Sequence, residues 1–340
     1  MQTLHNRRDF LASASLAGVA PASLAGVASL LGRGESFAQE APPETTTVRI
    51  PTGTLICNAP TYIADELLRA EGFTDIQHVP TTTERAGPDA MQGGVLDFAM
   101  AYTPPTVAAI EAGSPVTVLA GVHVGCNSLF AHEGIRSVRD LKGKKVGAGL
   151  VPQPLIASMA AYVGLDPVKD IEWVSSPFAT AKELFIQRKI DAFLALPPDP
   201  QDLRARNIGH VIVDSARDRP WSQHFCCVLI VTKEFVRKYP VATKRVLRAM
   251  LKATDFCASN PAAVARRLVD GGFTGNYDYA LQTLNEVWYN KWREYDAEDS
   301  VRFYSLRLRE AGMIKSTPSK IIADGTNWRF LNELKRELKG

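Results

Sequence analysis

Short apolar segments alternate with segments of helical periodicity along the chain after about residue 45. The alternation predicts strands at residues 48–51, 76–80 and 97–101, loops at 53–58, 81–88 and 102–105, and a short helix at 89–96. Pro60 is typical of an early helical position, and the apolar residues that follow it at helical spacing are Tyr62, Ile63, Leu67 and Leu68. Strand–loop–helix units of this kind predict an α/β fold, in which helices flank the sheets.

The second half of the chain changes in pattern. Further strands are predicted at residues 116–122 and 127–132, and a continuous apolar strand is predicted at 226–231. Helical stripes dominate after it: Val241, Val246, Leu247, Met250 and Leu251, then Tyr277, Leu281, Leu284, Val287, Trp288 and Trp292. We expect these stripes to be core rather than cofactor contacts.

The first 38 residues have a pattern of their own. Arg7 and Arg8, with Phe10 and Leu11 close behind, precede an uncharged run at residues 12–32, and small residues flank Phe37. This arrangement predicts a twin-arginine export signal that is cleaved after Ala38, and hence a periplasmic protein. The alternative is an uncleaved membrane anchor, against which Pro21 and the modest apolarity of the run both argue.

Length and charge narrow the class of protein. Without its first 38 residues the 340-residue chain is long enough for two ordinary domains. Its formal net charge is only +3, and its lysine-rich and arginine-rich stretches have no regularly interleaved aromatic residues. The sequence therefore does not predict a nucleic-acid-binding protein.

The five cysteines give no metal-binding motif. Cys57, Cys126, Cys226, Cys227 and Cys257 show neither a CxxC pair nor zinc-ligand spacing with histidine. Buried thiols are the simpler interpretation, and one bridge between distant cysteines stays open. Adjacent residues of a strand point to opposite faces, which disfavours a bond between Cys226 and Cys227. The chain also contains neither GxGxxG nor GxxxxGK[ST], so neither a metal nor a cofactor is predicted.

Several segments together resemble a known family. Residues 138–147, VRDLKGKKVG, resemble the start of the second lobe of type II periplasmic solute-binding proteins of ABC importers, in the nitrate/taurine/alkanesulfonate and thiamine-precursor-like group. Residues 187–193, QRKIDAF, resemble the strand that precedes a cleft loop in that family, here 196–200. The family's return helices resemble residues 234–240, 249–254 and 260–263. The order of these pieces carries the resemblance, which spans roughly residues 45–340.

The resemblance implies a fold and a role. The fold would be α/β, a two-lobed periplasmic binding protein type II (Venus flytrap) whose lobes are mixed sheets flanked by helices. Lobe one would combine residues 45–131 with 230–340, lobe two would be 132–229, and the crossings would lie near 130–134 and 227–232. Such a protein, commonly a monomer, captures a small organic solute (a sulfonate, a carboxylate, or an aromatic or pyrimidine-like compound) and delivers it to an inner-membrane ABC permease. It is not an enzyme.

The resemblance also suggests where the solute would bind. The expected ligand-binding residues are Thr52, Gly53, Asn58, Thr83, Arg85, Tyr102 and Thr103 from lobe one, and Val151, Gln153 and Asp199 from lobe two. Arg85 would pair with an anionic group and Tyr102 would stack on the ligand. Asn58 and Gln153 would fix its polar groups, while backbone N–H groups of Gly53 and Thr103 would donate to it. For each residue the alternative is a loop position that caps a helix or faces water.

One departure from the family affects the ligand. Residues 147–155 read GAGLVPQPL, where anion and sulfonate binders tend to carry small polar residues. Pro152 and Pro154 remove two N–H donors from the place where an oxyanion would need them. An aromatic or less charged solute is therefore as compatible with this loop as taurine or nitrate.

Two other classes of function stay open. A thiamine-pyrimidine-synthase-like enzyme shares the fold, but that branch carries a run resembling CCCxC, where this chain has only Cys226 and Cys227. The histidines beyond the signal are His78, His123, His132, His210 and His224, and they match neither HExxH nor a recognisable triad. A ligand-sensing module of a membrane receptor would have the same cleft and differ only in its partner.

Overall fold

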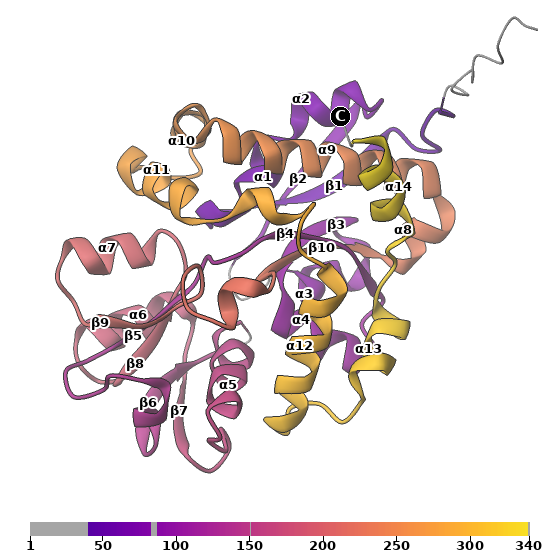
Figure 1. The fold of residues 1–340 in the computed structure, drawn as a ribbon. Coiled ribbons are helices and arrows are strands. Elements are labelled where there is room, and N and C mark those ends of the chain that lie inside the picture. Colours follow the sequence, from indigo (N-terminus) through magenta and orange to yellow (C-terminus); the bar gives the residue numbers. More distant parts are fainter. Residues whose placement is uncertain (1–39, 83–86, 150, 339–340) are drawn as a thin grey trace, which may run out of the picture. The chain divides into compact units, whose positions relative to one another are not determined.

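The computed structural model describes residues 40–82, 87–149 and 151–338, so the predicted export signal lies outside the described residues. Residues 41–340 form one unit built of three sheets and the helices around them (Figure 1). Among the described residues, no helix combines the length and apolarity that a membrane span requires.

The first sheet has two parallel strands. β1 (Thr47–Thr52) pairs with β2 (Asp75–Pro80) so that Val48 lies opposite Ile76. The connection contains η1 (Ile56–Asn58), α1 (Ala59–Tyr62) and α2 (Asp65–Ala70). The strands predicted at 48–51 and 76–80 are confirmed, and so is the helix that opens beside Pro60.

The second sheet is antiparallel, with β10 (Cys227–Thr232) between β3 (Phe98–Tyr102) and β4 (Val116–His123). All of β3 and β4 and nearly all of β10 is buried, which matches their continuous apolar sequences. The prediction of a loop at 102–105 is wrong, because β3 includes Tyr102 and α4 (Thr103–Glu111) begins directly after it. Pro104 and Pro105 fit the first turn of α4, where a missing N–H costs no helical hydrogen bond.

The helix expected at 89–96 is interrupted. α3 (Pro88–Met91) ends after one turn, and η2 (Gln92–Gly94) follows. Gly93 has φ 78°, a left-handed conformation that ends the helical path. Paired glycines near the predicted helix end were the sequence signal for this stop.

The third sheet has five strands in the order β7 (Ile171–Ser175), β6 (Lys144–Ala148), β8 (Ala192–Ala195), β5 (Ser128–Ala131) and β9 (His210–Asp214). β6 runs parallel to β7 and β8, whereas β5 is antiparallel to both of its neighbours. The helical segments in this part of the chain are η3 (Val138–Leu141), α5 (Pro152–Tyr162), α6 (Phe178–Ile186), α7 (Asp199–Ala205) and η4 (Trp221–Gln223).

The chain passes twice between the second and third sheets. β4 ends at His123 and β5 begins at Ser128, while β9 ends at Asp214 and β10 begins at Cys227. We call residues 124–127 and 215–226 the crossing segments. The change of sheet thus comes a few residues before each of the expected crossings at 130–134 and 227–232.

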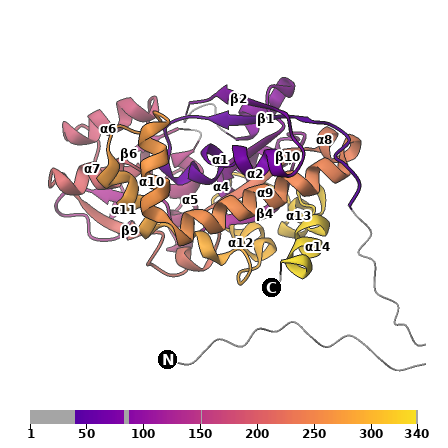
Figure 2. The same cartoon turned by 90° about the horizontal axis from the view of Figure 1, so that it is seen from above.

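The last third of the chain is helical. It contains α8 (Lys233–Lys238), α9 (Pro240–Ser259), α10 (Pro261–Asp270), α11 (Tyr277–Glu286), η5 (Tyr289–Lys291), α12 (Ala297–Glu310), α13 (Pro318–Gly325) and α14 (Arg329–Glu337). The long helix α9 runs beside α1 and α2 (Figure 2). Arg248 of α9 pairs with Glu71 at 2.6 Å, and the Glu44 carboxylate accepts the N–H groups of Val241 and Ala242 at the start of that helix. The late helices therefore return to the first sheet.

Most of the predicted helical stripes belong to the core. Val246, Leu247, Met250, Leu251 and Trp292 are all at most 2% exposed. Val241, Tyr277 and Leu281 are half-buried, and Trp288 is 37% exposed because it lies just outside α11.

Candidate functional site

Loops from the first and third sheets meet at the ends of β1 and β8. The N–H of Ile56, in the segment after β1, donates to the carbonyl oxygen of Pro197, in the segment after β8, at 3.4 Å. These are two of the loops that were expected to border a cleft, namely 53–58 and 196–200. Strand ends of an α/β sheet are a common place for ligands, so this junction is the candidate site.

Thr52 ends β1 and Gly53 begins the loop that follows it. The carbonyl of Thr52 accepts hydrogen bonds from the N–H and the hydroxyl of Thr81, at 2.8 and 3.1 Å. A Cβ added to Gly53 would lie 3.2 Å from the carbonyl oxygen of Thr81 and 3.6 Å from the hydroxyl of Tyr62. Gly53 therefore lets the loops after β1 and β2 approach closely.

Asn58 and Tyr62 give this loop a polar and an aromatic group. The N–H of Asn58 donates to Leu55 at 3.0 Å, and its half-buried side chain bonds to the Tyr62 hydroxyl. The ring of Tyr62 stacks on Phe273 with centroids 4.5 Å apart. Burial raises the pKa of Tyr62, with a smaller contribution from Cys57, so the hydroxyl stays protonated and can donate. The sequence pattern identified Tyr62 only as one of the apolar residues at helical spacing after Pro60.

Tyr102 and Thr103 are placed differently from expectation. Tyr102 is 5% exposed, and its hydroxyl lies 3.5 Å from Sγ of Cys57 inside the core. Thr103 is fully buried, with its N–H on the carbonyl of Cys226 at 2.8 Å and its hydroxyl on that of Phe225 at 2.7 Å. In this structure the Tyr102 ring therefore lies in the core, and the N–H of Thr103 is already used in a backbone hydrogen bond.

The loop after β6 brings Val151 and Gln153 to the start of α5. Val151 is buried, while Gln153 is half-buried and its N–H donates to Gly149 at 3.1 Å. Ser176, which follows β7, lies beside this loop, because a Cβ on Gly149 would be 3.8 Å from the Ser176 carbonyl. The buried hydroxyl of Ser176 has no hydrogen-bond partner in the described part of the chain. Sequence reasoning missed Ser176, although its place after a strand was a usable signal.

Asp199 is held by an ion pair at the start of α7. Lys182 contacts Asp199 at 2.7 Å and Asp202 at 2.8 Å. Burial raises the pKa of Asp199, and the nearby Lys182 opposes this only in part. Burial lowers the pKa of Lys182, but the hydrogen bonds of Asp199 and Asp202 outweigh it and leave the pKa raised. The carboxylate of Asp199 is thus already paired with Lys182 of α6.

A second polar junction joins α7 to α11. Glu286, the last residue of α11, accepts from Gln201 at 2.9 Å and from Arg204 at 2.8 Å through both carboxylate oxygens. The side chains of Arg204 and Glu286 are each about one-third exposed. We call this contact the Glu286 clamp. It connects the third sheet's helices to those that return to the first sheet.

The helices that begin at these loops offer few free donors. The prolines in their first turns are Pro60 in α1, Pro104 and Pro105 in α4, Pro152 and Pro154 in α5, and Pro200 in α7. The N–H groups of Thr103, Gln153 and Gln201 all donate to protein carbonyls. Anion sites at helix N-termini need free N–H groups, so the described helix starts are poorly suited to an oxyanion.

Thr83 and Arg85 lie outside the described residues. A cavity of ≈ 440 Å³ lies elsewhere, beside α8, and is lined in part by Arg49 of β1, Asp97 and Lys238. Arg49 and Asp97 pair there at 2.6 Å. None of the expected ligand-binding residues that the structure describes lines that cavity.

Similarity to known proteins supports this architecture. The crystal structure of the periplasmic nitrate-binding protein NrtA from Synechocystis PCC 6803 matches with a TM-score of 0.72 and 18% identity, over 88% of this chain and 90% of that one. The periplasmic aliphatic sulphonate binding protein SsuA from Escherichia coli matches with a TM-score of 0.63 and 19% identity, over 82% and 91%. The chain therefore has the periplasmic-binding-protein fold, with mixed sheets flanked by helices.

Sequence comparison identifies the family. A protein of Brucella abortus (strain 2308), named as a binding protein, is 28% identical over 177 residues, which are 51% of this chain and 54% of that protein. The chain thus spans about half the length of the curated relatives it matches. The model of the NMT1-like family matches residues 41–269. Because this match covers more than half of its residues, the chain belongs to the NMT1-like family.

Proposed function

We propose that this protein is the extracytoplasmic solute-binding component of an ABC importer. It captures a small organic solute between two lobes and delivers it to a permease in the inner membrane. The twin-arginine signal, cleavage after Ala38 and a monomeric state are parts of this proposal.

The observation that carries the proposal is the hydrogen bond from Ile56 to Pro197. It joins strand-end loops of two different sheets, the arrangement that a solute enclosed between lobes requires. Lobe one would comprise residues 45–131 and 230–340, and lobe two 132–229, with the exchange of sheets in the crossing segments. The Glu286 clamp would add a polar latch that forms when the lobes close.

The proposed solute is organic, and uncharged or with a single carboxylate. Proline-opened helices remove donors that sulfonate or nitrate would need, and the ammonium group of Lys182 is already paired with Asp199 and Asp202. Tyr62, Asn58, Gln153 and Ser176 would supply an aromatic face and neutral polar groups. A pyrimidine-like or aromatic carboxylate compound fits this set better than taurine or nitrate, and Arg85 would pair with its carboxylate.

A thermal-shift screen tests this function. Purified protein is melted with pyrimidines, aromatic carboxylates, alkanesulfonates, taurine and nitrate. A solute at 100 times its dissociation constant should add roughly 2.7 kcal/mol to the free energy of unfolding, because it binds only the folded state. We expect a shift from a ring-bearing compound and none from nitrate.

Matched variants locate the site. Gln153→Ala and Asn58→Ala should reduce the shift, whereas Gln77→Ala, on the exposed part of β2, should not change it. Turnover of the bound compound would replace the binding role with an enzymatic one. The absence of a shift with every class would overturn the proposed cleft.

A further inference from the structure

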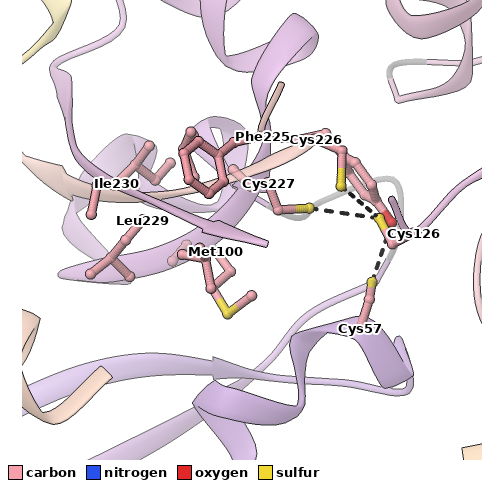
Figure 3. Close-up of a cluster of buried hydrophobic side chains, with 14 of the residues drawn as sticks. Cys57, Met100, Cys126, Phe225, Cys226, Cys227, Leu229 and Ile230 are labelled. Atoms are coloured by element: carbon pink, nitrogen blue, oxygen red, sulfur yellow. Dashed lines mark hydrogen bonds between the residues drawn. The ribbon is translucent and has the colours of Figure 1, made fainter. Parts of the chain in front are cut away.

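Four metal-binding side chains converge in the core. Each side chain offers one potential ligand atom, a sulfur or an imidazole nitrogen, and these atoms all lie within 4.8 Å of one another. The four residues are His123, Cys126, Cys226 and Cys227. All four are at most 4% exposed. Figure 3 shows the sulfur atoms of Cys226 and Cys227 both directed toward that of Cys126. We call these four residues the Cys–His cluster.

The distances within the cluster suit a tetrahedral ion. Sγ of Cys126 lies 3.2 Å from that of Cys226 and 3.9 Å from that of Cys227. Nδ1 of His123 lies 3.3 Å from Sγ of Cys226. Two sulfurs bound at about 2.3 Å to tetrahedral zinc are about 3.8 Å apart, so shifts of a few tenths of an ångström would complete the shell.

Hydrogen bonding does not explain why the imidazole is buried here. His123 is fully buried, and its Nε2 has no hydrogen-bond partner among the described residues. Its other nitrogen faces only thiols, which are weak donors and acceptors. A buried polar ring without good hydrogen bonds is destabilising, whereas a metal–nitrogen bond would give it a strong partner.

Local backbone features bring the four residues together. The pairing of β10 with β4 places Cys227 opposite His123, and a bulge follows at once, because Val228 lies opposite Gly121. Bulges redirect side chains at the end of a ladder. Gly125 has φ +73°, and a Cβ there would collide with Ala216, so glycine permits the tight turn that leads to Cys126.

Both crossing segments contribute to the cluster. Cys126 lies in the first and Cys226 in the second, while His123 and Cys227 are the adjoining ends of β4 and β10. An ion at this point would therefore connect the two passages of the chain between the second and third sheets.

The geometry points to a structural zinc site in which His123, Cys126, Cys226 and Cys227 bind one Zn²⁺ and fasten the two crossing segments together. Three cysteines and one histidine form a common closed zinc shell, and full burial leaves no open coordination position for substrate. Cys57 is not one of the four ligands. Cys57 hydrogen-bonds to Cys126 (Figure 3), and its sulfur lies 3.5 Å from the Tyr102 hydroxyl. It would therefore position the metal ligand Cys126 without binding the ion itself.

Metal analysis tests the site. The full chain is expressed with zinc in the medium, purified without oxygen, and measured for metal content and free thiols. We expect about one zinc per chain, since the shell is complete with four protein ligands. Replacement by Co²⁺ should give thiolate-to-cobalt charge-transfer bands and the d–d bands of a tetrahedral ion.

Serine variants assign the ligands. Cys126→Ser and Cys226→Ser should reduce bound zinc at least tenfold, whereas Cys257→Ser, which removes an equally buried thiol outside the cluster, should leave it unchanged. If a ligand variant fails to fold, the cobalt spectrum of the wild-type chain still decides the question.

Two results would overturn the site. One is a wild-type chain that binds neither zinc nor cobalt after reduction. The other is a Cys126–Cys226 disulfide in the isolated protein together with no metal uptake after the bridge is reduced. Equal zinc content in Cys126→Ser and in the wild type would likewise refute the ligand assignment.

Discussion

The third sheet is joined to the rest of the described chain in two regions that differ in burial and in the chemistry of their contacts. At the crossing segments the contacts are buried sulfur and imidazole groups from residues that are at most 4% exposed. At the strand-end loops the contacts are one backbone hydrogen bond of 3.4 Å and the Glu286 clamp, whose side chains are about one-third exposed. Water can replace the second set of contacts but not the first. We therefore expect the crossing segments to stay fixed and the loops to separate when the protein opens.

The largest expected effect on stability comes from adding a side chain to Gly125, in the turn of the first crossing segment. Gly125→Ala should lower the free energy of unfolding by about 3 kcal/mol or more, because the new Cβ meets the backbone of Ala216 and alanine disfavours a positive φ. Gly134→Ala is the matched control. Gly134 also has positive φ, but nothing lies within 4 Å of its Cβ position, so the loss should be only about 1 kcal/mol. Chemical denaturation measures both, and equal losses would show that the crossing is not tightly packed.

A smaller effect is expected at the outer edge of the Cys–His cluster. Cys57→Ser should leave about one zinc per chain but weaken its affinity roughly tenfold, since groups that hydrogen-bond to metal ligands tune affinity without determining stoichiometry. Competition with a chromophoric chelator measures the change, and Cys257→Ser is the reference. Loss of all zinc from Cys57→Ser would instead make Cys57 a ligand and alter the coordination shell.

The loop contacts should respond to a milder change. Glu286→Gln weakens the bonds to Arg204 and Gln201, and it should lower solute affinity about threefold, or about 0.7 kcal/mol, by destabilising the closed arrangement. Glu310→Gln removes a similar ion pair to Arg307 within α12 and should leave affinity unchanged. Titration calorimetry with the solute found in the screen distinguishes them. A Glu286→Gln affinity equal to that of the wild type would exclude the clamp from closure.

Local patterns in the sequence were enough for most strands and several helix starts. The strands at 48–51 and 76–80 were predictable because apolar runs end in clear turn signals, and Pro60 marked a helix start correctly. The double proline at 104–105 was misread as a loop, since a proline pair is compatible both with a turn and with the first helical turn. Tyr102 is buried because both faces of β3 are covered, and strand periodicity alone could not reveal this.

The Cys–His cluster could not be found from spacing. His123 and Cys126 are about one hundred residues from Cys226 and Cys227, and only the pairing of β4 with β10 brings them together. The argument that Cys226 and Cys227 would point to opposite faces assumed one regular strand. β10 begins at Cys227, so Cys226 lies before the strand and both thiols reach Cys126. Cleft loops, in contrast, lie at strand ends that the sequence pattern predicts, and the family resemblance then suggested Thr52, Gly53, Asn58 and Gln153 as ligand-binding residues.

The smallest expected effect lies where the two regions meet. Asp214 ends β9 at the start of the second crossing, and burial raises its pKa, with smaller like-charge contributions from Asp218 and Glu286. Its carboxylate also accepts from Ala216 at 2.9 Å and pairs with Arg217 at 3.4 Å, which limits the effect. Because the folded-state pKa lies above the unfolded one, the stabilising contribution of the protonated form is present below the unfolded value and is lost as the pH rises through the folded one.

Asp214→Asn should therefore raise the melting temperature slightly at pH 7, by the equivalent of up to about 0.5 kcal/mol, and leave it unchanged near pH 3. Thermal melts across this range measure the difference. Combining the change with Glu286→Gln should remove part of the gain, since the repulsion is then already absent. A gain that is the same at both pH values would mean that the charge of Asp214 is not its cause.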